Sequence, residues 1–173
     1  MTFRIFLIVL WAVAPLVAAE PEALMQVDAL YLNRHQGRNL EKSTQRLREG
    51  LHATPRDTDL LWRLGRNLVA EAGRRSGRNA QLAGFAEAVA VLEQAIAAKP
   101  AEAQAHYWLA QERGKENAIR RTLGLAKSMK AELETTIALD PSHAGAHQLL
   151  CELLRQLPSL FGGDMKRAVG ECE

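Results

Sequence analysis

The sequence predicts an all-α protein made of antiparallel helix pairs stacked in series, and three observations point to it. No stretch of the chain alternates polar and apolar residues with a period of two, so we expect no β-strand. The pattern Leu-x3-(Leu/Ile)-x3-Pro occurs three times, ending at Pro55, Pro100 and Pro141. Nine residues after each of these prolines comes a leucine followed by a small residue: Leu64-Gly65, Leu109-Ala110 and Leu150-Cys151.

Each proline is expected to close the second helix of a pair, because proline has no N–H to donate and clashes with the preceding turn. The second helix before Pro100 shows one apolar stripe with steps of three or four residues, at Phe85, Val89, Leu92 and Ile96. We therefore divide the chain into four units, the first of them the weakest, at about residues 23–55, 56–100, 101–141 and 142–173.

The first nineteen residues have the pattern of a secretory signal peptide. Arg4 is followed by fifteen uncharged, mostly apolar residues at 5–19, and then by the acidic Glu20. A helix of that length rises about 22 Å, short of the roughly 30 Å hydrocarbon core of a membrane. We expect cleavage after Ala19 and a folded domain at 20–173 that is periplasmic or secreted. An uncleaved membrane anchor is the alternative.

The repeated positions resemble the tetratricopeptide repeat (TPR), a family of helix pairs of about 34 residues. The second unit matches best, at Leu61, Leu64, Gly65, Ala88, Leu92, Ala95 and Pro100. The segments AHYWLA, IALDPSHAGAH and LPSLFGGD resemble one TPR subgroup, which includes the periplasmic component associated with TRAP transporters and, more distantly, regulators of microtubule dynamics. The resemblance implies a short right-handed superhelix and a binding protein rather than an enzyme.

The prolines are 45 and 41 residues apart, more than a TPR unit needs. We expect the excess to lie between the two helices of a unit. In the second unit it falls around residues 73–79, where Gly and Ser interrupt the helix, and in the third around 114–126.

In TPR arrays the first helices of the pairs line a concave surface. Projecting the first helices of the last three units places six residues there: Trp62, Arg66, Tyr107, Gln111, Gln148 and Glu152. Because Trp, Tyr and Arg often dominate binding energy at interfaces, we expect this face to bind a protein or peptide. Alternatively, Trp62 and Tyr107 pack against neighbouring helices. We expect Trp108 to belong to the core.

Three potential metal ligands follow one another in steps of four: His143, His147 and Cys151. On a helix they share one face, and imidazole with thiolate suits zinc or copper. His147 and Cys151 nevertheless occupy repeat positions that serve packing in the other units, and no fourth ligand is visible. We therefore expect neither a metal site nor a cofactor.

Cys151 and Cys172 lie at about the same level of the last helix pair. In an exported protein they could form a disulfide worth roughly 3 kcal/mol, the alternative being two buried thiols.

The net charge of +2 is too balanced for general nucleic-acid binding. Residues 34–78, however, contain 11 Lys and Arg against 5 Asp and Glu, a local net charge of +6. Such a segment is either a solvated face or a surface that attracts an acidic partner or a membrane.

The leading functional hypothesis is a non-enzymatic periplasmic scaffold that binds a protein, a peptide or a second copy through the concave face. A carrier or gate for a small apolar ligand is the alternative, and an enzyme or metal protein is disfavoured. The sequence stops about ten residues into the last helix, near Val169 and Cys172. We expect either a truncated sequence or a partner, such as a second copy, that covers this end.

Overall fold

The computed structural model describes residues 20–172, which contain α-helices, one short 3-10 helix and no strand. The elements are α1 (Pro21–Leu32), α2 (Asn39–Ala53), α3 (Thr58–Arg74), α4 (Arg78–Ala98), α5 (Ala103–Arg120), α6 (Leu123–Leu139), α7 (Ala144–Gln156), η1 (Ser159–Phe161) and α8 (Met165–Cys172). The prediction of an all-α fold is confirmed. The expected signal peptide at 1–19 lies outside the described residues.

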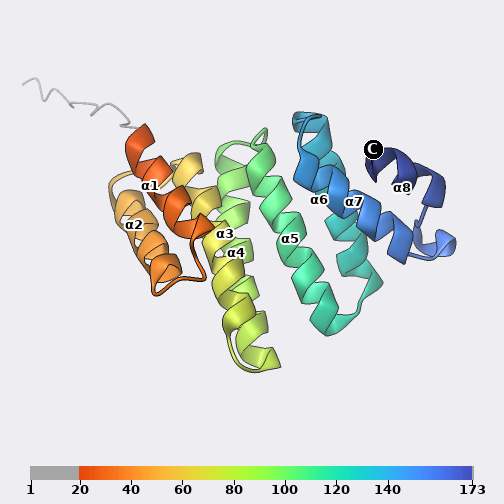
Figure 1. Ribbon diagram of the computed structural model, residues 1–173, viewed down its shortest axis with the longest axis horizontal. Coiled ribbons are helices and arrows are strands. Elements are labelled where there is room, and N and C mark those ends of the chain that lie inside the picture. The colour runs from red at the N-terminus through yellow and green to blue at the C-terminus, as the bar shows by residue number, and fades with distance from the viewer. Residues whose placement is uncertain (1–19, 173) are drawn as a thin grey trace, which may run out of the picture.

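The helices stack as four antiparallel pairs. Each odd-numbered helix packs against the even-numbered helix that follows it, and α3 also contacts both α1 and α5. Figure 1 shows the pairs in series along the long axis, from α1 and α2 at one end to α7 and α8 at the other. We call the side lined by α1, α3, α5 and α7 the first-helix face.

The three repeated prolines lie just beyond the ends of second helices. The helices α2, α4 and α6 each end two residues before a proline, at Ala53, Ala98 and Leu139. Two of the following helices begin with a side-chain cap. The Asp57 carboxylate accepts from Leu60 N–H over 3.2 Å, and His143 Nδ1 accepts from Ala146 N–H over 3.1 Å. Proline and cap together set the helix boundaries.

Equivalent leucines form the core of successive pairs. The leucines that precede the prolines by eight residues, Leu47, Leu92 and Leu133, are all fully buried. Those that follow the prolines by nine residues are buried too: Leu64, Leu109 and Leu150. The small residue after Leu64 permits close packing, because a Cβ at Gly65 would lie 2.5 Å from Leu92 Cδ2.

The irregular connections within the second and third pairs are much shorter than the sequence predicted. The helix α3 continues through Gly73 to Arg74, and α5 continues through Gly114 to Arg120. The connections are only three residues at 75–77, where Gly77 has a φ of 90°, and two residues at 121–122. A helical glycine costs about 1 kcal/mol, which packing between long neighbouring helices can offset. The additional residues therefore form additional helical turns.

Candidate functional site

Two of the six expected surface residues are buried between helices. Trp62 is 8% exposed and packs among apolar side chains of α3, α4 and α5, while Arg66 is 6% exposed. The projection onto an open concave face was therefore wrong for these two. The reason for Trp62 is packing against α4 and α5, and the reason for Arg66 is that α1 lies against α3 and supplies its partners.

Arg66 is held between an acidic residue and an aromatic ring of α1. Its Nη1 donates to Asp28 Oδ1 over 2.8 Å, and its guanidinium lies 3.9 Å from the centre of the Tyr31 ring. Arg63 binds the other oxygen of the same carboxylate over 3.0 Å. Burial lowers the pKa of Arg66, and Asp28 opposes that shift. These arginines fix α1 on α3, and their charges are already compensated.

Tyr107 and Gln111 lie nearer the surface of the first-helix face. Both are partly buried, and Gln111 Nε2 donates to the Tyr107 hydroxyl over 2.9 Å. The Tyr107 ring also contacts His143, with ring centres 4.5 Å apart. Tyr107 therefore packs α5 against the start of α7, while part of its side chain remains accessible on the surface. Trp108 packs against the core, as expected.

Gln148 and Glu152 on α7 are exposed. Glu152 accepts a hydrogen bond from Gln156 of the same helix. The structure therefore leaves these two polar side chains accessible on α7, where Gln148 borders a hollow next to the end of α8.

A cavity of about 340 Å³ opens on the first-helix face between α1, α3 and α5. Its lining has three kinds of side chain. Four are basic, two are aromatic and the remainder are small, apolar or amide: Arg34, His35, Arg74, Lys115; Tyr31, Trp108; Val69, Ala70, Gly73, Gln111. We call it the inner basic cavity. No acidic residue lines it, so it attracts anions.

Two arginines of the inner basic cavity are oriented by neutral groups. Arg34 Nη1 donates to the Tyr31 carbonyl over 3.2 Å, and its guanidinium lies 4.5 Å from the Tyr31 ring centre. Arg74 Nη2 donates to the Arg34 carbonyl over 2.7 Å. Within residues 20–172, no ion pair involves Arg34, Arg74 or Lys115. Their charges are therefore not compensated by the chain's own carboxylates.

The sequence signal for this cavity was the basic segment 34–78, which contains Arg34, His35 and Arg74. That segment gave no information on which of its cations are paired. Lys115 and Tyr31 lie outside it and were not singled out. They join the cavity because α5 and α1 lie on either side of α3.

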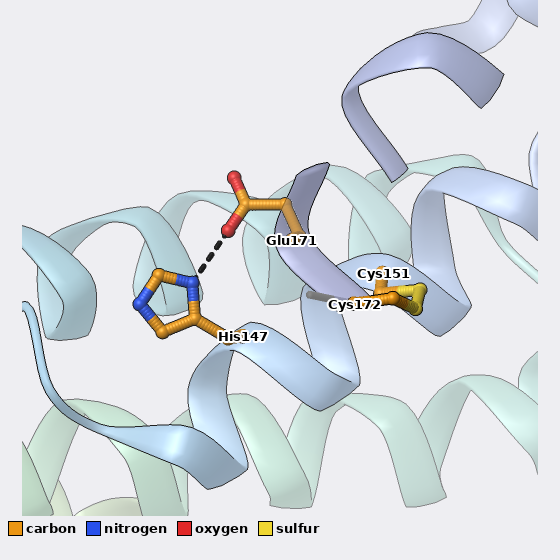
Figure 2. The surroundings of a disulfide bond; sticks show 4 residues. All are labelled: His147, Cys151, Glu171 and Cys172. Carbon is orange, nitrogen blue, oxygen red and sulfur yellow. Dashed lines mark hydrogen bonds and ion pairs between the residues drawn. A yellow bond between two sulfur atoms is a disulfide. The ribbon is translucent and has the colours of Figure 1, made fainter. Parts of the chain in front are cut away.

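The three potential metal ligands have other partners. His143 caps α7, and His147 Nδ1 donates to Glu171 over 2.6 Å. Cys151 is joined to Cys172 by a disulfide, with Cα atoms 5.6 Å apart, so it offers no thiolate. Figure 2 shows the disulfide beside the His147–Glu171 pair, both joining α7 to α8. Among the side chains of residues 20–172, no group of three His, Cys, Asp or Glu is arranged to hold a metal ion.

The bridge made by His147 has a counterpart in the preceding helix pair. His106 Nδ1 donates to Glu132 over 2.7 Å, and its Nε2 lies 3.0 Å from the Pro100 carbonyl. His147 Nε2 likewise lies 3.1 Å from the Pro141 carbonyl. A carboxylate and a carbonyl only accept, so both nitrogens of each ring are satisfied only in the imidazolium. The hydrogen bond to the glutamate is the main reason why the pKa of each histidine is raised.

No helix within the described part of the chain is both long and apolar enough to cross a membrane.

Comparison with solved structures supports the fold. MamA, as the RS-1 ArsTM double mutant, has a TM-score of 0.57 at 19% identity, and the match covers 86% of this chain and 68% of that one. A Thermobaculum terrenum O-GlcNAc transferase mutant, K341M, has a TM-score of 0.54 at 19% identity. That match covers 79% of this chain but only 24% of the transferase chain. At this identity the likeness concerns the fold, which is that of a TPR-type helical repeat protein.

No curated protein matches the chain. A family model does: "RMD1-3: Regulator of microtubule dynamics protein 1-3" matches residues 23–157, which is most of the sequence. The chain therefore belongs to the regulator of microtubule dynamics protein 1-3 family of TPR-like helical repeat proteins.

Proposed function

We propose that this protein is a non-enzymatic scaffold that binds a protein or peptide partner through its first-helix face. TPR-like helical repeats serve protein–protein interaction in general. The observation that supports this site is the inner basic cavity, whose cations have no carboxylate partner within residues 20–172. The helix α7, which also lines this face, adds the exposed polar side chains of Gln148 and Glu152.

Site-specific photo-crosslinking tests this proposal. A benzophenone amino acid at Gln148 is compared with one at Ala90, an exposed residue of the second helix α4. We expect a discrete crosslinked protein, identified by mass spectrometry, from position 148 and not from position 90. Equal crosslinking from both positions, or none from either, would contradict the use of this face.

The alternative of a carrier for a small apolar ligand finds less support. The apolar part of the inner basic cavity consists of Val69, Ala70 and two aromatic residues, and four basic side chains surround it. Removing the three cations Arg34, Arg74 and Lys115 from water for an apolar ligand is unfavourable. The cavity therefore favours an anionic or polar partner.

We also propose that the protein is exported. The signal-like pattern at 1–19 supports this, as does the disulfide, because such bonds persist mainly in oxidising compartments. Mass spectrometry of the mature protein should give an N-terminus at Glu20. A mature protein that retains residue 1 in the cytosolic fraction would overturn the proposal.

Self-association through the C-terminal end is part of the same proposal. Three apolar side chains of this end are well exposed: Leu160, Met165 and Val169, at 85%, 62% and 55%. Light scattering of the wild type and of Val169→Glu tests it. We expect a dimer that the substitution disrupts, and a monomeric wild type would count against this part of the proposal.

A further inference from the structure

The arginines of this protein fall into two groups according to their partners. Arg63, Arg66, Arg75 and others bind carboxylates of the chain, as in the Arg75–Glu87 pair at 2.9 Å. Arg34 and Arg74 are instead held by carbonyl oxygens and a ring face. Because neutral groups leave the positive charge uncompensated, these two arginines remain able to bind an external anion.

The inner basic cavity is also partly organised before any ligand arrives. Two guanidinium groups are fixed by hydrogen bonds to backbone carbonyls of Tyr31 and Arg34. The ring of Tyr31 is itself held against Trp108, with ring centres 5.8 Å apart and an interplanar angle of 83°. Groups that are already ordered lose less conformational entropy on binding. The arrangement therefore suits a ligand that presents carboxylates to fixed cations.

The dimensions limit what can enter. A cavity of about 340 Å³ is near the lower end of the range for ligand pockets. It admits a few side chains and not a folded domain. Val69, Ala70 and Gly73 supply a small apolar wall, so a short segment with an apolar residue beside its acidic ones suits the lining.

The charge of the rest of the protein argues against an extended polyanion. Outside residues 34–78 the chain has 11 Lys and Arg against 15 Asp and Glu. A membrane surface or a nucleic acid backbone would face this acidic remainder, including the exposed Glu152 on α7. A short acidic segment that reaches only the cavity avoids that repulsion.

We propose that the inner basic cavity binds an acidic polypeptide segment, whose carboxylates contact Arg34, Arg74 and Lys115. This inference rests on the proposed function and names the chemistry of its partner. His35, at the mouth of the same cavity, and the amide of Gln111 add hydrogen-bonding groups for the segment.

Gly73 provides a sharp test because it lines the cavity. A Cβ built there meets no atom within 4 Å, so a longer side chain extends into open space without a clash. The residue lies in α3, where Glu and Gln are both better helix formers than Gly. Gly73→Glu therefore places a carboxylate beside the cations, and Gly73→Gln is a control of the same size without the charge.

The probe is a fluorescein-labelled 12-residue peptide that alternates Glu and Asp with Leu and Ala, measured by fluorescence anisotropy. A second peptide with Gln and Asn in place of the acidic residues is the neutral control. We expect Gly73→Glu to raise the Kd for the acidic peptide about tenfold. Lys115→Gln should raise it about threefold, and binding should weaken as salt increases. Gly73→Gln adds a side chain of the same size without the charge and should raise the Kd clearly less than Gly73→Glu does. Lys127→Gln, at an exposed lysine on α6 outside the cavity, should leave the Kd within about twofold.

Three results would overturn the proposal: equal binding of the two peptides, an unchanged Kd in Gly73→Glu, or binding to phosphatidylglycerol vesicles in place of the acidic peptide. Circular dichroism of each variant establishes that the helices are retained. The crosslinking at Gln148 separates this proposal from the general one. If a partner still crosslinks there in Gly73→Glu with unchanged yield, the scaffold function stands and the cavity proposal fails. If no partner crosslinks even in the wild type, the scaffold function itself fails.

Discussion

The second and third helix pairs place different polar residues at the same buried repeat position. Asn67 on α3 and Glu112 on α5 each lie twelve residues after a proline, and both are fully buried. Asn67 Oδ1 accepts from the Ser43 hydroxyl over 2.8 Å, and its NH2 group donates to the Arg63 carbonyl over 3.2 Å. The Glu112 carboxylate makes no hydrogen bond to any described residue, and Arg113 Nη1 lies 3.5 Å from one of its oxygens. The fourth pair has Leu153 at this position.

The difference shows that a repeat position determines how deeply a side chain is buried. It does not determine whether a polar side chain there finds hydrogen-bond partners. At equal burial, the amide of Asn67 has hydrogen-bond partners on α2, whereas the carboxylate of Glu112 does not. Burial raises the pKa of Glu112 from 4.5 to about 7, against the attraction of Arg113. A buried polar group is therefore stabilising in one pair and costly in the next.

The largest effect is expected from Glu112→Leu. The folded state holds the Glu112 proton up to a pH of about 7, whereas the unfolded chain releases it near 4.5. Between these values the folded state binds more protons, so the free energy of unfolding falls as the pH rises and is lowest above about 7. Glu112→Leu should raise the free energy of unfolding by about 3 kcal/mol at pH 8 and by much less at pH 4.

Urea unfolding at pH 4, 6 and 8 measures this effect. The exposed Glu22 on α1 provides the control, since Glu22→Leu should change the free energy of unfolding by less than about 0.5 kcal/mol. If the free energy of unfolding of Glu112→Leu depends on pH as that of the wild type does, the buried carboxylate does not destabilise the third pair. The comparison of the two pairs then fails.

A similarly large loss is expected when the disulfide is removed from the fourth pair. The bond joins residues 21 apart in sequence and ties the eight-residue α8 to α7. Cys172→Ser should lower the free energy of unfolding by roughly 3 kcal/mol, because the unfolded chain regains the entropy of an open loop. Dithiothreitol should have the same effect on the wild type and none on the variant. An unchanged wild type under reduction would show that the bond does not stabilise the pair.

Asn67→Leu should have the opposite sign to Glu112→Leu. It removes the buried amide oxygen that accepts from the Ser43 hydroxyl, and we expect the free energy of unfolding, measured with urea at pH 8, to fall by about 2 kcal/mol. Adding Ser43→Ala should recover part of the loss, because both polar partners are then absent. If Asn67→Leu were stabilised, the hydrogen bonds of Asn67 would not be what distinguishes the second helix pair from the third.

The smallest effect concerns the histidine bridges that the third and fourth pairs share. Because the folded-state pKa of His106 and His147 is raised, their stabilisation is fully present below about 6.5 and is lost as the pH rises through the raised values. His106→Gln should cost about 1 kcal/mol at pH 5 and less at pH 9. Glu132→Gln should lower the pKa of His106 and leave that of His147 unaltered, as measured by NMR titration. A joint shift would show that the bridges are not independent.

The fold could be predicted from sequence because its determinants are local and repeated. Leu64, Leu109 and Leu150 occupy equivalent buried places, and the prolines set the ends of the second helices. The length of α3 and α5 could not be predicted in the same way. Gly73 and Gly114 indicate an interruption locally, and only the neighbouring helices make the helical conformation favourable.

The candidate site was predicted less well because it depends on contacts distant in sequence. Projection onto a helix placed Arg66 on a face, but it could not show that Asp28 and Tyr31 of α1 cover that face. Charge counting found the basic segment 34–78, but pairing decides which of its cations are free to bind. Gln148 and Glu152 of α7 are exposed, as expected.

The covalent link between α7 and α8 also has a consequence for how the array comes apart. In stacked repeats each pair is supported mainly by its neighbours, so the pair with the weakest ties opens first. Here a disulfide between the two cysteines of the chain joins α7 to α8. The first pair is held only by noncovalent interactions, such as the ion pair between Asp28 and Arg63 of α3. Loss of structure should thus start at α1 and travel towards the C-terminus, so that proteases cut first in the turn at 33–38.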